Sequence, residues 1–220
     1  MTEPAKLVIL GAGGLGREVL ATVRACNEAG RQWDVLGFLD ADEKLAGKKV
    51  GGVPVLGGDD WYRNNQYESL RFVCAIGKPE VRSRVVETMS AVKSKFVSVV
   101  HPAVQVAESV AIGAGTVIMA GTQFTADIRI GSHVVIYLNC SITHDVCVGD
   151  FCVIPSGCNL SGGAILETGV LLGSGVSVLP RRRIGAWATI GAGSVVVKDI
   201  PPKSTAMGAP CRVIEQRPGS

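Results

Sequence analysis

The most regular feature of the chain is an apolar residue at every sixth position between Val100 and Val196, with no insertion. Four residues after most of these positions stands a small or β-branched residue, except at Ile128, Arg182 and Ile200. Two inward positions in every six fit a short strand and a turn, whereas a helix repeats every 3.6 residues. The pattern therefore predicts a β-helix of hexapeptide repeats. The apolar positions are Val100, Val106, Ile112, Ile118, Phe124, Ile130, Ile136, Ile142, Val148, Ile154, Leu160, Leu166, Leu172, Val178, Ile184, Ile190 and Val196.

The first hundred residues follow a different pattern, in which short apolar runs alternate with amphipathic stretches. The runs predict strands at residues 6–10, 35–39, 53–56 and 72–77, and the stretches predict helices at 17–29 and 79–92. Alternating strands and helices are typical of a Rossmann-like α/β domain. We therefore expect an α/β domain at 1–97, the β-helix at 98–202 and a C-terminal tail at 203–220.

The first strand runs directly into a glycine-rich turn, GAGGLG at residues 11–16, and then into a helix. Glycines let the backbone approach a phosphate closely, and a helix N-terminus offers free N–H groups to an anion. Asp40 ends the second strand, about where an acidic residue would meet a ribose or a base edge, and Asp42 competes for that role. The alternative is that the glycines only pack the helix on the strand, and the motif alone does not choose a nucleotide.

Composition agrees with a folded protein and narrows its partners. Of the 220 residues 47% are apolar, only 5% are aromatic and 28 are glycine, which excludes disorder and favours a narrow aliphatic core. The formal charge of +3 is spread along the chain, which disfavours nucleic-acid binding but permits a local anion site. The first apolar run, at residues 7–10, is too short for a signal peptide or a membrane span. We expect a cytoplasmic protein with no membrane insertion.

The repeat register also assigns several cysteines and one unusual arginine. Seven cysteines without a CxxC pair make a disulfide framework or a zinc site improbable, so we expect no metal. Cys140, Cys152 and Cys158 fall on the small inward position and are expected in the core, whereas Cys147 points outward. Arg182 falls on the inward position too, and we expect an irregular turn there because burying an unpaired guanidinium is costly.

Three histidines provide the only imidazoles. His101 precedes a proline at the domain junction, where a structural role is expected, and His133 is expected to be a solvated turn residue. His144 lies in a turn and is followed at once by Asp145. Transfer of an acyl group to an amine or a hydroxyl needs a base near neutral pKa, and a carboxylate can hold the tautomer of an imidazole. Adjacency in sequence does not ensure that Asp145 reaches the ring.

The chain resembles the hexapeptide-repeat sugar O- and N-acyltransferases of bacterial glycan synthesis, such as the bacillosamine and perosamine N-acetyltransferases. The resemblance rests on GAGGLGREV at 11–19, GFLD at 37–40, AIG at 75–77, HDVCVGDF at 144–151 and MGAP at 207–210. It implies a left-handed β-helix, a homotrimer and acetyl-CoA as the acyl donor, with no resident metal. It also implies that the amino group of a nucleotide-linked amino-dideoxysugar attacks the thioester directly.

The resemblance further implies a role for individual residues. His144 is the general base and Asp145 its partner. Acetyl-CoA lies along the later coils, between two subunits. The residues implied to bind the nucleotide sugar are Gly11, Gly13, Gly14, Leu15, Gly16, Asp40, Gly77, Lys78 and Asn139. The residues implied to bind acetyl-CoA are Gly162, Gly173, Arg181, Arg183, Gly191, Lys198, Lys203 and Arg212.

Some positions depart from the family pattern, and other functions stay open. Leu15 stands where a histidine is frequent, and Tyr137 stands where an asparagine is frequent, so either Tyr137 or Asn139 could meet the sugar. A histidine base would serve a hydroxyl acceptor equally well, as in sialic acid O-acetyltransferases. Two further alternatives are a nucleotide-binding oxidoreductase with a trimerising β-helix, and a scaffold or carbonic-anhydrase-type protein, which would need a histidine cluster for zinc.

Overall fold

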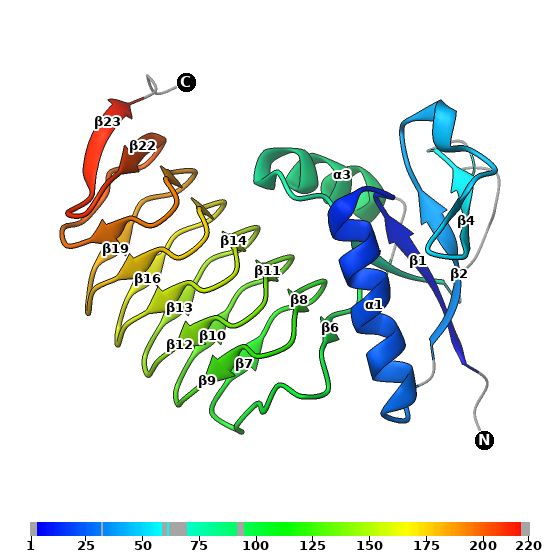
Figure 1. Cartoon of the computed structure of the whole chain (residues 1–220), viewed down its shortest axis with the longest axis horizontal. Coiled ribbons are helices and arrows are strands. Elements are labelled where there is room, and N and C mark those ends of the chain that lie inside the picture. Colours follow the sequence, from blue (N-terminus) through cyan, green and yellow to red (C-terminus); the bar gives the residue numbers. More distant parts are fainter. Residues whose placement is uncertain (1–3, 32, 59–60, 62–69, 92–94, 217–220) are drawn as a thin grey trace.

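The chain forms an α/β unit at the N-terminal end of a long β-solenoid, as Figure 1 shows. This computed structural model describes residues 4–31, 33–58, 61, 70–91 and 95–216. The sheet of the α/β unit has the order β3-β4-β2-β1-β5, in which only β3 is antiparallel to its neighbour. Its elements are β1 (Ala5–Leu10), α1 (Gly14–Glu28), β2 (Trp33–Leu39), the 3-10 helix η1 (Glu43–Leu45), β3 (Lys49–Val50), β4 (Val53–Gly57), β5 (Arg71–Cys74) and α3 (Pro79–Ala91).

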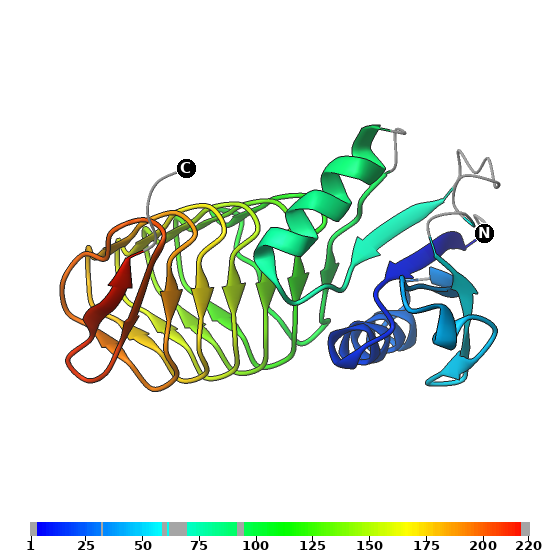
Figure 2. The same ribbon diagram turned by 90° about the horizontal axis from the view of Figure 1, so that it is seen from above.

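The solenoid consists of short parallel strands in three sheets, whose arrows lie side by side along its length (Figure 2). The first sheet holds β6 (Val99–Val100), β8 (Val117–Ile118), β11 (Val135–Ile136), β14 (Val153–Ile154), β17 (Leu171–Leu172), β20 (Thr189–Ile190), β22 (Ser204–Met207) and β23 (Arg212–Gln216). The second holds β9 (Gln123–Phe124), β12 (Ser141–Ile142), β15 (Asn159–Leu160), β18 (Ser177–Val178) and β21 (Val195–Val196). The third holds β7 (Ala111–Ile112), β10 (Arg129–Ile130), β13 (Cys147–Val148), β16 (Ile165–Leu166) and β19 (Arg183–Ile184).

Each strand pairs with the strand one coil later. Arg129 pairs with Cys147 and Cys147 pairs with Ile165, a spacing of 18 residues, or three hexads, per coil. Successive coils therefore place residues 18 apart in one column. Three corners join the sheets, and each is named here by a residue in it: the His133 corner (third to first sheet), the Asn139 corner (first to second) and the His144 corner (second to third).

The two inward positions of each hexad form the core, as the sequence predicts. The inward residues from Ile130 to Val196 are at most 4% exposed. Cys140, Cys152 and Cys158 are at most 1% exposed, which confirms their core assignment. Their thiols donate to carbonyl oxygens of the next coil; Cys152 Sγ, for example, lies 3.0 Å from the oxygen of Glu167. The small inward side chains thus also link consecutive coils.

Every turn from residue 115 to 193 has one residue in the left-handed backbone region, at intervals of six. Glycine, aspartate and asparagine occupy most of these positions, as expected from their tolerance of positive φ. Arg181 takes the same conformation (φ 58°), so the irregular turn expected at Arg182 is wrong. The turn stays regular because the long side chain of Arg182 reaches the surface, where its Nη1 lies 3.6 Å from Asp199 Oδ1.

Both ends of the solenoid differ from the expected register. Val106 is 41% exposed in a loop, so its inward placement is wrong; Val104 and Val110, each 8% exposed, pack inward instead. No earlier coil lies over Val106 for it to pack on. At the other end, β22 and β23 form a hairpin that extends the first sheet, where the sequence suggested only a tail.

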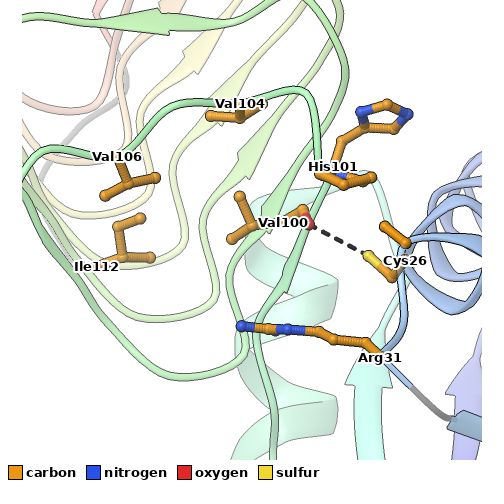
Figure 3. A pocket seen from close by; sticks show the side chains of 9 residues that line it. Cys26, Arg31, Val100, His101, Val104, Val106 and Ile112 are labelled. Carbon is orange, nitrogen blue, oxygen red and sulfur yellow. Dashed lines mark hydrogen bonds between the residues drawn. The ribbon is translucent and has the colours of Figure 1, made fainter.

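A cavity of about 400 Å³ lies between the end of α1 and this first loop (Figure 3). Val100, Val104 and Ile112 line it, and Cys26 Sγ donates to the Val100 oxygen at 3.2 Å across the junction. His101 Nδ1 accepts a hydrogen bond from the Ala103 N–H, which agrees with its expected structural role. The cavity is therefore a feature of the domain junction.

The α/β unit packs on the outer face of the first sheet. Val117, Met119 and Val135 share one apolar cluster with Leu15 and Val19 of α1. Helix α3 lies alongside the first coils in both views (Figures 1 and 2). The two parts therefore share buried surface and do not merely adjoin.

His133 is buried at this junction, so its prediction as a solvated turn residue is wrong. Its imidazole is stacked on Phe151, with ring centroids 5.3 Å apart, and meets Phe96 edge-on at 4.8 Å. The residue is 8% exposed, and no partner for its Nδ1 is found in the described part of the chain. Burial, helped by the nearby charge of Arg82 and opposed by Asp150, lowers the pKa of His133 to about 4.

This burial makes the stability of the fold depend on pH. A histidine whose pKa falls from 6.5 to about 4 on folding stabilises the protein fully above pH 6.5, and the contribution is lost as pH falls toward 4. The loss from this group is at most about 3 kcal/mol. Urea unfolding at pH 7 and pH 5 should show less of this loss in His133→Phe, which keeps the ring stack and tolerates positive φ as Phe151 does. A control, His101→Asn, should retain the wild-type pH dependence; equal slopes in all three proteins would contradict the assignment.

Candidate active site

The glycine-rich turn divides into two packing glycines and two open ones. A Cβ on Gly16 would lie 2.1 Å from the Gly11 oxygen, and one on Gly11 would lie 2.8 Å from the Ala75 oxygen. Gly11 also has φ +102°, which favours glycine. Beside Gly13 and Gly14, by contrast, nothing lies within 4 Å. The first pair closes the α/β unit, and the second pair leaves the N-terminus of α1 open to an anion.

Asp40 lies at this turn and braces it. Its Oδ2 accepts the Ala12 N–H at 2.8 Å and its Oδ1 accepts the Asp42 N–H at 2.9 Å. Asp42 instead caps η1 by accepting the Lys44 N–H, so the structure separates the two candidates. Of the two, Asp40 is the residue at the carboxyl edge of the sheet, which is where ligands bind in open α/β folds.

The other residues of the implied nucleotide-sugar set lie in different surroundings. Leu15 turns its side chain into the core at 9% exposure, so only its backbone can face a ligand. Gly77 and Lys78 are exposed just before α3, at the same edge as the glycine-rich turn. Asn139 is exposed at its own corner of the solenoid, while Tyr137 is half-buried against the α/β unit. Burial and the charge of Glu18 raise the pKa of Tyr137.

At the His144 corner the predicted catalytic pair is formed. His144 Nδ1 lies 2.8 Å from Asp145 Oδ2, and both side chains are about two-thirds exposed, at 66% and 67%. Asp145 holds the left-handed turn position (φ 62°), which directs its carboxylate back to the ring. Because an ionised carboxylate only accepts hydrogen bonds, Nδ1 donates and Nε2 keeps its lone pair. The pair can therefore act as a proton acceptor at the surface.

Gly162 makes room for this imidazole. It lies 18 residues after His144, and a Cβ there would stand 2.5 Å from His144 Cε1 and 2.6 Å from Nε2. The sequence implied a contact with acetyl-CoA for Gly162, whereas the structure gives it the role of seating the base. The usable signal was that His144 and Gly162 are one coil apart.

Positive charge gathers on the same corner in later coils. Arg181 is exposed two coils after His144, and its backbone N–H donates to the Gly162 oxygen. Lys198 is exposed in the turn that leaves β21, at this corner too. Arg183 lies just past the corner and forms a 2.7 Å ion pair with Glu167, which lowers the pKa of that carboxyl. Glu167 had not been singled out in the sequence, although it lies about one coil before Arg183.

The remaining residues implied for acetyl-CoA lie elsewhere. A Cβ on Gly173 would lie 2.3 Å from the Ala192 nitrogen, and one on Gly191 would lie 2.8 Å from Met207 Cβ, so both allow close coil stacking at the Asn139 corner. Lys203 lies at the His133 corner, and Arg212 lies in β23. The structure therefore does not bring the whole predicted set together in one chain.

The glycine-rich turn and His144 are also separated within the chain. The α/β unit packs on the first sheet, whereas His144 lies at the corner between the second and third sheets. In a triangular coil this corner is the one opposite the first sheet. One chain thus presents a nucleotide edge and a basic residue on different sides.

Comparison with known proteins agrees with this arrangement. A family profile described as the PglD N-terminal domain matches residues 6–89. The structure of PerB from Caulobacter crescentus, in complex with CoA and GDP-perosamine, is 32% identical, covers 96% of this chain and 97% of its own, and superposes with a TM-score of 0.88. The acetyltransferase domain of PglB from Neisseria gonorrhoeae is 28% identical, covers 96% and 100% of the two chains, and has a TM-score of 0.87.

Curated relatives match only a short stretch of the repeats. A galactoside O-acetyltransferase of Lactococcus lactis is 56% identical over 48 residues, which is 22% of this chain and 23% of the relative. A serine acetyltransferase of Salmonella typhimurium is 44% identical over 55 residues, 25% of this chain and 20% of the relative. The chain thus spans less than a quarter of these relatives, and the end-to-end structural match decides the family. The chain belongs to the hexapeptide-repeat sugar acyltransferases.

Proposed function

We propose that the protein is an acetyl-CoA-dependent N-acetyltransferase acting on the amino group of a nucleotide-linked amino-dideoxysugar. The observation behind this proposal is the His144–Asp145 pair, seated over Gly162 on a cationic corner, in a chain similar from end to end to PerB in complex with CoA and GDP-perosamine. PglB from Neisseria gonorrhoeae has also been solved with acetyl coenzyme A. Both complexes support a CoA thioester as the donor.

In the proposed reaction the sugar amine attacks the thioester carbonyl. A C–N bond forms, the C–S bond breaks, and His144 Nε2 takes the proton that the nitrogen loses and returns it to the departing sulfur. Asp145 stabilises the imidazolium that exists between these two transfers. Arg181 and Lys198 attract the anionic donor along the corner that His144 occupies. The open N-terminus of α1 receives the diphosphate of the acceptor.

The active site is proposed to lie between copies of the chain in a homotrimer, with a left-handed coil as the resemblance implies. Within one chain His144 stands opposite the sheet that supports the α/β unit, so an acceptor held at Gly13 and Gly14 faces away from it. A neighbouring copy can present its own His144 corner to that acceptor. The division of the implied acetyl-CoA residues between the His144 and Asn139 corners supports the same arrangement.

The acceptor is tested directly by acetyl transfer. The 4-amino-4,6-dideoxy sugars linked to UDP, GDP and dTDP are each incubated with acetyl-CoA, beside the matching 4-hydroxy sugars and free sialic acid. We expect mass spectrometry to show acetylation of an amino sugar and of no hydroxyl acceptor. Transfer to sialic acid alone would replace the proposal with an O-acetyltransferase of that type.

Replacement of the proposed base should abolish turnover with little effect on folding. His144→Asn removes the proton acceptor from an exposed corner, so kcat should fall by about 10²-fold to 10⁴-fold, as is usual for loss of a general base. Acetyl-CoA binding by calorimetry and the thermal midpoint should stay near wild type. His101→Asn, which changes a histidine at the domain junction, should leave kcat unchanged. Retention of a tenth of the wild-type kcat in His144→Asn would exclude the role.

The seat of the imidazole is tested at Gly162. Its φ is not positive, so Gly162→Ala adds a methyl group without backbone strain, and the added carbon displaces the exposed His144 ring. Since a displacement of about 1 Å costs up to about 10²-fold in rate, we expect kcat to fall about 10-fold to 100-fold. The circular dichroism spectrum and thermal midpoint should show an intact fold. An unchanged kcat would mean that the ring position does not matter.

A further inference from the structure

One charged side chain outside the catalytic corner is completely buried. Arg82 of α3 is 0% exposed, and no ion pair to it is found in the described part of the chain. Its guanidinium has five N–H groups, and five carbonyl oxygens accept from it. The acceptors are the backbone oxygens of His133, Ile76, Gly77, Phe151 and Cys152.

These five carbonyls belong to both parts of the molecule. Arg82 Nη1 donates to Ile76 and Gly77, in the segment that follows β5 at the carboxyl edge of the α/β sheet. Arg82 Nε donates to His133 at 2.9 Å, and Nη2 donates to Phe151 at 2.7 Å, in consecutive coils of the solenoid. A planar guanidinium with fixed donor directions holds both groups in one geometry.

The segment that Arg82 holds lies against the glycine-rich turn. The Ala75 N–H donates to the Leu10 oxygen, and the Ala75 oxygen is the atom that a Cβ on Gly11 would approach to 2.8 Å. Gly77 and Lys78 are exposed at this edge, beside the turn. A change at Arg82 therefore reaches the nucleotide edge through one backbone segment.

We infer that Arg82 is a positioning residue that fixes the nucleotide-binding edge relative to the solenoid. Its kinetic consequence rests on the proposed function, because the edge must present the sugar amine to a catalytic corner. Lysine keeps the charge but offers three tetrahedral donors, which cannot satisfy the five carbonyls of the two parts. Arg82→Lys should loosen the edge without removing any group that touches substrate.

The test uses the full chain, with Arg84→Lys as the matched control. Arg84 is exposed two residues further along α3, and its Nε donates to Glu80 within the same helix. In Arg82→Lys, hydrogen exchange of the amides of Ala75, Gly77 and Lys78 should accelerate at least 10-fold, while the coils from β16 to β21 stay unchanged. Unchanged exchange at the edge would overturn the inference. If the lysine variant does not fold, Arg82→Gln is measured in its place.

Kinetics provide a second readout. For Arg82→Lys the KM of the nucleotide sugar should rise at least 10-fold, while the KM of acetyl-CoA changes less than 2-fold. A purely structural role would lower kcat with the folded fraction and leave both KM values unchanged, and that result would overturn the inference. If the wild-type chain acetylates no nucleotide sugar, the proposed function fails, and the exchange experiment still decides the role of Arg82.

Discussion

The structure depends on the pairing of each solenoid strand with the strand 18 residues later. This pairing satisfies the backbone hydrogen bonds of very short strands, which could not be stable alone. It also makes every side chain at a corner a neighbour of residues one coil before and after it. Position in the sequence, taken modulo 18, thus decides which residues meet. His144, Gly162, Arg181 and Lys198 share a corner for this reason, although they are far apart in the chain.

The regularity explains how much could be predicted from the sequence. An aliphatic residue at every sixth position leaves one way to stack the coils, so the core, the cysteines and the outward histidine follow from counting. The pairing of His144 with Asp145 was a correct hypothesis, but only the left-handed turn at Asp145 shows why the carboxylate reaches the ring. The strands of the α/β unit were predicted within a few residues because each is a short buried run.

The errors lie where the chain leaves the repeat or where two parts meet. Val106 obeys the period but has no earlier coil to pack on, a fact that the period does not contain. His133 occupies an ordinary turn position, and its burial comes from Phe96 and α3, which reach it from the other part of the molecule. Arg182 was expected to distort its turn because a side chain at an inward position was assumed to be buried, whereas a long one can reach water. Contacts between distant segments cannot be read from a local pattern.

The corners also show how the solenoid accommodates large side chains. His133 lies over Gly115, Asn139 over Gly121 and Trp187 over Gly169, so each leans on a glycine of the preceding coil. His144 leans the opposite way, over Gly162 of the following coil. That direction carries its Nε2 toward the coils that hold Arg181 and Lys198, and away from the end where the α/β unit is attached. A single glycine in the next coil thus aims the proposed base at the corner where an anionic donor is attracted, using only the stacking that holds the fold together.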